Sequence, residues 1–351
     1  MIWTIWSGIS GKEYLRNYLD FKEGKCKERL ILDTFLTIEK LFDLAKKYRK
    51  NIISLDDVNS YHNVEYFIFF NMPNFKDPII KNLKKYNKKF ILIIVEAREI
   101  HPQNFNRKLY KNFKFIFTYN DLYIDNKKIF YYHFGVDKTH RLKISNNKKF
   151  CCMISSNKII NYHNSLYPLR LKIIKWFEKN KKWNFDLYGQ GWNLKLFFSK
   201  YKFLRIINRI NYFFAFIKNN FINYKGEIKP LLKDKLSILK NYKFSFVIEN
   251  FNTTNGWITE KIFHCFFCNV IPIYSGPPNV CKYIPKNCYV DFNKFSTLNE
   301  LCFFLKNMTK KKRIMYIRNK NNFLNSKKFD KFDINKNFSI IEKKLIFNNY
   351  R

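Results

Sequence analysis

Polar and charged side chains crowd one junction of the chain, in the segment FSFVIENFNTTNGWITEK at residues 244–261. Its apolar run predicts a buried strand, and Glu249 and Asn250 follow at the carboxyl end. A helix is expected to begin just before Glu260 and Lys261. The helix dipole favours the acid there and disfavours the lysine, but free N–H groups at a helix start bind anions. Lys261 therefore either shares a bound phosphate with the helix or is a solvated lysine tied to a nearby acid.

A second set of ionisable residues lies in FILIIVEAREIHPQNF, at residues 90–105. A buried strand is expected to end at Glu96, with Glu99 and His101 just beyond it. An acid at a strand end is partly desolvated, which raises its pKa and suits it to accept a proton. Glu96 is therefore the first candidate for a general base, ahead of Glu99 in the loop and of His101 before a proline.

Arg170 is a further cation in an unfavourable position. It follows Pro168 in the first turn of the helix predicted at residues 165–180, where the dipole again disfavours positive charge. It is either a surface arginine of that helix or a ligand for an anion.

The elements that must position these residues alternate along the chain. In the first half, the apolar patterns predict strands and helices as follows: strands at 1–6, 64–73, 90–97, 113–120 and 128–135, helices at 34–48 and 79–90. After a polar linker at 135–149, a second series is expected: strands at 150–156, 183–189, 242–250 and 270–276, helices at 165–180, 233–241 and 258–269. This alternation predicts an α/β protein with two facing Rossmann-like domains and a cleft between them.

The domain boundaries expected from this pattern are 1–147, 148–310 and 311–351. The last segment is rich in lysine and asparagine, so we expect a basic extension that frays after about Thr309. A basic, aromatic insertion at 193–223 is either an amphipathic helix on a membrane surface or a helical hairpin packed on its domain.

The composition leaves the class of partner open. The formal net charge of +39 favours phosphate-rich partners, although residues with A/T-rich codons are abundant and codon bias explains part of the excess. The basic residues are scattered, which argues against one dedicated nucleic-acid patch. The eight cysteines fit free thiols in a reducing compartment, and Cys265, Cys268 and His264 fall in one predicted helix without a second ligand pair for zinc.

No run of ~18 uncharged apolar residues is present, and the apolar N-terminus is too short for a signal peptide. We expect a cytoplasmic protein, soluble or peripheral at the membrane.

Three motifs together resemble the signature of the α1,3-fucosyltransferases, glycosyltransferase family 10: VIENFNTTNGWITEKIF, VIPIYSGPPN and YIPKNCYVDFNKF. The resemblance is nearly gapless from residue 233 to about 306, and weaker stretches such as FFNMP and VEAREIHPQNF extend it over most of 50–306. It implies a soluble member of the bacterial type with the GT-B fold. The N-terminal domain would then be on the acceptor side, and the second domain would bind the GDP-sugar donor. The implied activity is transfer of L-fucose from GDP-fucose to a glycan hydroxyl, with inversion.

The same resemblance implies a role for each matching residue. Arg170 and Lys261 would bind the diphosphate, Asn250 would lie near the phosphates and sugar, and Glu260 would accept from the ribose hydroxyls. Glu96 would be the general base. Further positions of the motif have a secondary or structural role: Glu249, Trp257, Thr259 and, in the acceptor half, Glu99.

Two positions depart from the family pattern, and the residues of the guanine pocket are not identified by it. The family often has tyrosine at the position of Trp257, and tryptophan or leucine at that of Ser275. These two departures weaken the implied specificity for fucose more than any other implication of the resemblance. The guanine pocket is expected near residues 226–232.

No metal site is expected. The chain contains no Asp-x-Asp, so cationic side chains and helix N-termini must neutralise the leaving diphosphate. No cofactor is required on this interpretation, and a divalent metal is at most stimulatory.

The expected partners are GDP-fucose and a glycan acceptor, either lipid-linked or a surface polysaccharide. Three alternatives stay open: the same fold with another nucleotide sugar, a basic nucleic-acid-binding protein, and a membrane-surface scaffold built around residues 193–223.

Overall fold

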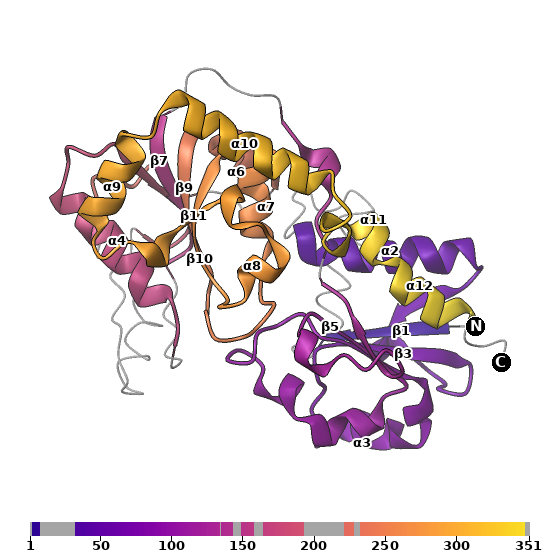
Figure 1. Cartoon of the computed structure of the whole chain (residues 1–351). Coiled ribbons are helices and arrows are strands. Elements are labelled where there is room, and N and C mark those ends of the chain that lie inside the picture. The colour runs from indigo at the N-terminus through magenta and orange to yellow at the C-terminus, as the bar shows by residue number, and fades with distance from the viewer. Residues whose placement is uncertain are drawn as a thin grey trace, which may run out of the picture. The chain divides into compact units, whose positions relative to one another are not determined.

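Two compact units make up the chain. The computed structural model describes residues 2–7, 32–133, 135–142, 149–157, 164–192, 221–227 and 232–347. Unit 1 comprises Met1–Asp137, Thr254–Gly256 and Phe329–Arg351, and unit 2 comprises Lys138–Thr253 and Trp257–Lys328. Each unit contains one sheet of parallel strands, which Figure 1 shows with its covering helices. Part of the 193–223 insertion, residues 193–220, lies outside the described residues, so both interpretations of it stay predictions.

The sheet of unit 1 has six strands in the order β2-β1-β3-β4-β5-β6. Their bounds are β1 Ile2–Ser7, β2 Asn51–Ser54, β3 Val64–Phe70, β4 Phe90–Ile93, β5 Phe115–Thr118 and β6 Ile129–Tyr131. Every neighbouring pair is parallel, as predicted from the buried apolar runs. The structure adds β2, whose four residues NIIS are too few to show a strand period.

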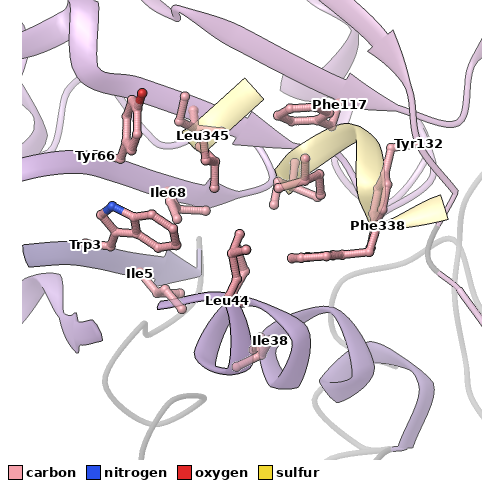
Figure 2. Close-up of a cluster of buried hydrophobic side chains, with 14 of the residues drawn as sticks. Trp3, Ile5, Ile38, Leu44, Tyr66, Ile68, Phe117, Tyr132, Phe338 and Leu345 are labelled. Atoms are coloured by element: carbon pink, nitrogen blue, oxygen red, sulfur yellow. The ribbon is translucent and has the colours of Figure 1, made fainter. Parts of the chain in front are cut away.

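One face of this sheet packs on helices from both ends of the chain. The helices are α2 (Leu32–Lys47), α11 (Ile334–Asn337) and α12 (Ser339–Ile346). Figure 2 shows the cluster, with Leu44 of α2 and Phe338 directed into the same apolar space beside Trp3. The opposite face carries an aromatic group centred on Phe69 and Phe90, whose rings lie 5.0 Å apart, near α3 (Pro78–Leu83). Short 3-10 turns complete the unit: η1 Leu55–Asp57, η2 Lys84–Lys89, η3 Pro102–Phe105, η4 Arg107–Asn112, η5 Asp121–Tyr123 and η9 Phe329–Lys331.

The sheet of unit 2 has five strands in the order β11-β10-β9-β7-β8. Their bounds are β7 Lys149–Ile154, β8 Phe185–Tyr188, β9 Tyr242–Ile248, β10 Ile271–Ser275 and β11 Val290–Asp291. The helices are α4 Tyr167–Lys179, α6 Leu232–Leu239, α7 Glu260–Phe267, α8 Val280–Tyr283, α9 Leu298–Lys306 and α10 Lys310–Leu324, with 3-10 turns η6 Lys138–His140, η7 Lys286–Cys288 and η8 Phe292–Lys294. From β7 the chain goes to one neighbour, β8, and then returns to the other, β9. In doubly wound sheets, ligands bind at the carboxyl ends of strands at this reversal.

The expectation that the chain frays after Thr309 is wrong. Thr309 caps α10, and Lys320 of that helix is buried, donating to the Phe266 carbonyl and, over 2.6 Å, to Asn269 Oδ1 at the end of α7. A cation at a helix C-terminus is favoured by the dipole. Beyond α10, the apolar side of α12 covers the sheet of unit 1. The lysine-rich sequence conceals these contacts because the apolar residues are few and well spaced.

No helix of the described residues is long and apolar enough to span a bilayer.

Candidate functional site

A cavity of about 290 Å³ lies in unit 2 at the carboxyl ends of β7 and β9. Its walls come from Met153–Ser156 at the end of β7, Gly189 and Gln190 after β8, and Ser245–Ile248 of β9 with Asn250 just beyond it, together with side chains of α4, α6 and α7. The volume is at the lower end of the ~300–1,000 Å³ range of small-molecule sites. The sheet topology thus puts a pocket at the reversal, and four predicted residues line it: Arg170, Asn250, Glu260 and Lys261.

Glu249 is the centre of the polar contacts beside this cavity. Its carboxylate is fully buried and accepts hydrogen bonds from the Thr259 N–H and hydroxyl, each at 2.9 Å, and from the Tyr274 hydroxyl at 3.2 Å. Thr259 is also the N-cap of α7 and accepts from the Lys261 N–H. The buried acid therefore fixes the first turn of α7 against the end of β9.

Lys261 is tied to this acid and lines the cavity as well. Its Nζ lies 3.0 Å from Glu249 Oε2 and 2.9 Å from Thr259 Oγ1. Burial lowers the pKa of Lys261, but the neighbouring Glu249 and Glu260 carboxylates outweigh burial and raise it above its ordinary value. The ammonium group therefore stays charged, which explains how a lysine is tolerated where the helix dipole disfavours it.

Glu260 supplies an anionic acceptor at the same cavity. Burial favours its neutral form, but the positive charges of Lys261, Lys235 and His264 hold its pKa down, at about 2. The carboxylate is therefore ionised near neutral pH and can accept hydrogen bonds from hydroxyl groups. Lys235 comes from α6 and was missed by the sequence interpretation. Nothing local distinguishes it from the many other lysines, because only the packing of α6 brings it here.

Arg170 is buried, so its interpretation as a surface arginine is wrong. Only 4% of the residue is exposed, and Nε donates to the Ile248 carbonyl at 3.2 Å while Nη2 donates to Asn250 Oδ1 at 3.0 Å. The guanidinium also lies over the Tyr167 ring, 4.4 Å from its centroid. Burial lowers the pKa of Arg170. Arg170 thus joins α4 to the end of β9 at the cavity wall and orients Asn250.

The loops after β7 and β8 add polar groups that sequence reasoning did not single out. Ser155 Oγ is buried and has no hydrogen-bond partner among the described residues, and it belongs to a residue of the cavity wall. Gly189 has φ +132°, and a Cβ there would lie 1.9 Å from the Ser155 carbonyl oxygen. Only glycine permits this close approach of the two loops. The sequence signal for these two loops is the pair of serines at 155–156 and the Gly-Gln-Gly at 189–191.

The other predicted site residues lie outside this cavity. Trp257 is buried at 4% exposure in unit 2 and is not among the wall residues. Of the expected guanine region, residues 228–231 lie outside the described part of the chain. Glu96, Glu99 and His101 belong to unit 1, where Thr254 Oγ1 donates to Glu99 Oε2 over 3.4 Å and His101 Nε2 contacts the Met72 carbonyl at 2.8 Å.

Glu96 is not in the strand that was expected to end with it. β4 stops at Ile93, and Glu96 follows in a bend. The physical reason is that the Asn71 carboxamide, instead of a neighbouring strand, accepts from the N–H groups of Val95 and Glu96, at 3.0 and 2.9 Å.

Within the described residues, no cluster of three or more His, Cys, Asp or Glu side chains could hold a metal ion.

The fold is that of the GT-B glycosyltransferases, according to comparison with solved structures. A crystal structure of an α1,3-fucosyltransferase with GDP-fucose aligns with a TM-score of 0.52 at 14% identity, over 99% of this chain and 90% of that chain. An α-glucosyltransferase in complex with UDP and DNA aligns with a TM-score of 0.52 at 10% identity, over 98% of both chains. At such identities the likeness establishes the fold alone.

The family follows from the sequence of unit 2. Residues 144–332 match the family described as glycosyltransferase family 10 (fucosyltransferase), C-terminal part, and the chain belongs to this family. An α-(1,3)-fucosyltransferase of Helicobacter pylori is 30% identical over 103 residues, which is 26% of this chain and 21% of that protein. An α-(1,4)-fucosyltransferase of Arabidopsis thaliana is 33% identical over 70 residues, 20% of this chain and 17% of that protein. The matched segments thus span about a fifth of these relatives.

Proposed function

We propose that this protein transfers L-fucose from GDP-fucose to a hydroxyl group of a glycan, with inversion, as an α1,3-fucosyltransferase. The observation that carries the proposal is the cavity at the β7/β9 reversal. There Arg170, Lys235 and Lys261 meet beside the ionised Glu260. Three cations and an anionic acceptor match a ligand that has both phosphate and hydroxyl groups.

The residues of the cavity fit the parts of a nucleoside diphosphate sugar. Lys261, at the start of α7, would bind the diphosphate together with the backbone N–H groups of that helix. Arg170 would add a second cation and hold Asn250 toward the sugar. Glu260 would accept from the ribose hydroxyls.

The reaction itself requires a base and a stabilised leaving group. The acceptor oxygen attacks the anomeric carbon of fucose, the bond from that carbon to the diphosphate oxygen breaks, and GDP leaves with the electron pair. The proton of the acceptor hydroxyl goes to a carboxylate, for which we propose Glu96. Lys261 and Arg170 would stabilise the charge that develops on the diphosphate.

This scheme needs no metal ion, since Lys261 and Arg170 would neutralise the charge of the leaving diphosphate. A divalent ion would at most stimulate the reaction. Turnover that persists in EDTA supports this part of the proposal, and complete loss that Mn²⁺ restores contradicts it.

The proposal also covers the acceptor and the membrane. The proposed acceptor is a glycan, either lipid-linked or part of a surface polysaccharide, and the proposed location of the enzyme is the cytoplasm. Peripheral membrane contact through residues 193–223 belongs to this proposal. Binding to anionic vesicles at low salt, with loss on deletion of residues 196–219, is its test. Nucleic acid is not proposed as a specific ligand, because scattered lysines bind it weakly and without sequence preference.

The alternative of another nucleotide sugar is kept open by Trp257 and Ser275, where the chain departs from the family pattern. A thermal-shift series with GDP, ADP and UDP, followed by GDP-fucose against GDP-mannose, separates the two. Stabilisation by GDP and turnover of GDP-fucose support the proposal. Stabilisation by UDP or ADP but not by GDP overturns it.

A further inference from the structure

The backbone of Glu96 is held by side chains from three other segments of unit 1. The Glu96 N–H donates to Asn71 Oδ1 at 2.9 Å. The Glu96 carbonyl accepts from the Tyr119 hydroxyl at 3.0 Å and from Asn104 Nδ2 at 3.4 Å. Both polar groups of this residue's backbone are therefore bonded to side chains, although Glu96 lies beyond the last residue of β4.

Asn71 links Glu96 to Asn104 through its side-chain oxygen. It directly follows β3, and its Oδ1 also accepts from the Val95 N–H at 3.0 Å and from Asn104 Nδ2 at 2.9 Å. Its backbone has φ +67°, in the left-handed region that costs energy for residues other than glycine. Asparagine is among the residues that tolerate this conformation, and such backbone strain persists where the surroundings enforce it.

Asn104 completes the arrangement from η3. It is fully buried, and its Oδ1 accepts from the Met72 N–H at 2.7 Å while its carbonyl accepts from the Tyr110 hydroxyl at 2.6 Å. The amide group of Asn104 thus bridges the residue after Asn71 and the carbonyl of Glu96. A side-chain network with all its members bonded is rigid, because each displacement breaks several hydrogen bonds at once.

We propose that Asn71, supported by Asn104, is a positioning residue for the general base: it fixes the backbone from which the Glu96 carboxylate projects. This inference rests on the proposed function, in which Glu96 accepts the proton of the acceptor hydroxyl. Proton transfer requires the base within hydrogen-bond reach of that hydroxyl, and a misplacement of ~1 Å can cost ~100-fold in rate. A bend outside the strand would not hold its position so closely without such contacts.

Asn71→Gly is the variant that isolates this role. Glycine adopts the left-handed backbone without strain, so the turn after β3 is preserved while the hydrogen-bond acceptor is lost. Asn126→Gly is the matched control, because Asn126 is another asparagine of unit 1 with a left-handed backbone, at φ 57°, and lies in an exposed turn. The two variants share the change of residue type and differ in the contacts that are removed.

The first measurement is hydrogen exchange at individual backbone amides. In Asn71→Gly, the amides of Val95 and Glu96 should exchange at least tenfold faster, while those of Ile91 and Leu92 within β4 stay unchanged. Asn71→Asp keeps an acceptor at the same reach and should restore protection. Unchanged exchange at Val95 and Glu96 in Asn71→Gly would overturn the proposal whatever the activity of the enzyme.

The second measurement is the rate of GDP release from GDP-fucose with a panel of oligosaccharides. Asn71→Gly should lower kcat about 10- to 100-fold and leave KM for GDP-fucose and the affinity for GDP unchanged, whereas Asn126→Gly should match the wild type. Wild-type kcat in Asn71→Gly would overturn the positioning role. A wild-type protein that turns over no GDP-fucose would instead refute the proposed function, and the exchange data would still decide whether Asn71 fixes Glu96.

Discussion

Glu249 and Lys261 form an ion pair, 3.0 Å between Oε2 and Nζ, in which only the lysine reaches solvent: its side chain is 29% exposed and that of the acid is fully buried. Loss of the lysine should therefore cost more stability than loss of the acid. Without Lys261, the carboxylate keeps its bonds to Thr259 and Tyr274 among the described residues. Without Glu249 the ammonium group can turn to water in the cavity. Removing one partner of a buried pair costs ~3–5 kcal/mol when the other charge stays buried.

Loss of Lys261 alone should therefore be more harmful to folding than loss of both charges. We expect Lys261→Met to lower the free energy of unfolding by about 3 kcal/mol. The double variant Glu249→Gln with Lys261→Met should regain part of this loss, because the neutral amide needs no cation. Chemical denaturation of the two single variants and the double variant measures the difference. A double variant less stable than either single variant would contradict this account.

The affinity for GDP should depend on the positive charge of Lys261 and not on the ion pair with Glu249. In the Glu249→Gln background, Lys261→Met should weaken GDP binding by about tenfold, since a charge-assisted hydrogen bond contributes ~1.5–3 kcal/mol. Lys172→Met is a suitable control, because Lys172 is exposed on α4, two residues from the cavity residue Arg170. Isothermal titration with GDP gives both affinities. Equal losses in the two lysine variants would show that only the overall charge matters.

The low pKa of Glu260 predicts how stability depends on pH. Folding holds this pKa at about 2, below the ordinary 4.5, so the folded state favours the ionised form. The resulting stabilisation is present above the unfolded-state pKa and is lost as the pH falls through the folded-state pKa. The difference in unfolding free energy between wild type and Glu260→Gln should be largest above pH 4.5 and shrink toward pH 2. A difference that does not change with pH would mean that the carboxylate is not held ionised by its neighbours.

The sequence was sufficient to predict those elements and residues that produce a local pattern in it. Buried parallel strands are apolar runs, so β3, β4 and β9 were found, and the acid at the end of β9 and the lysine at the start of α7 stood out by position. Lys235 and Asn71 could not be found in this way. The place of Lys235 depends on the packing of α6, and the role of Asn71 depends on side-chain contacts with a loop 24 and 25 residues away.

The C-terminal helix α12 should be essential to the stability of unit 1, against the expectation of a fraying tail. Leu345 is fully buried in the cluster of Figure 2, while Phe347, two residues further on, is 57% exposed. Leu345→Ala should lower the free energy of unfolding by ~2–5 kcal/mol, because it leaves a cavity in a packed core. Phe347→Ala should change it by no more than ~0.5 kcal/mol. Denaturant unfolding of both variants decides this, and equal effects would show that the helix does not pack as described.

The choice between Glu96 and Glu99 as the base rests on how the two acids are held. The backbone of Glu96 is bonded through both its N–H and its carbonyl, whereas Glu99 accepts from the Thr254 hydroxyl over 3.4 Å through its carboxylate itself. A base needs a backbone that is held in place, and the hydrogen bonds to both backbone groups of Glu96 are the reason for choosing it.

Glu96→Gln keeps the shape of the side chain but cannot accept the proton. We expect it to reduce kcat for fucosyl transfer by at least 1,000-fold, within the range of ~10²–10⁴-fold attributed to general base catalysis. The affinity for GDP and the free energy of unfolding should stay at wild-type values, because the cavity proposed to bind GDP lies in unit 2 and the backbone contacts of Glu96 are retained. Glu99→Gln, as the matched control, should retain most of the activity. Near-wild-type turnover in Glu96→Gln together with inactivity of Glu99→Gln would assign the base to Glu99.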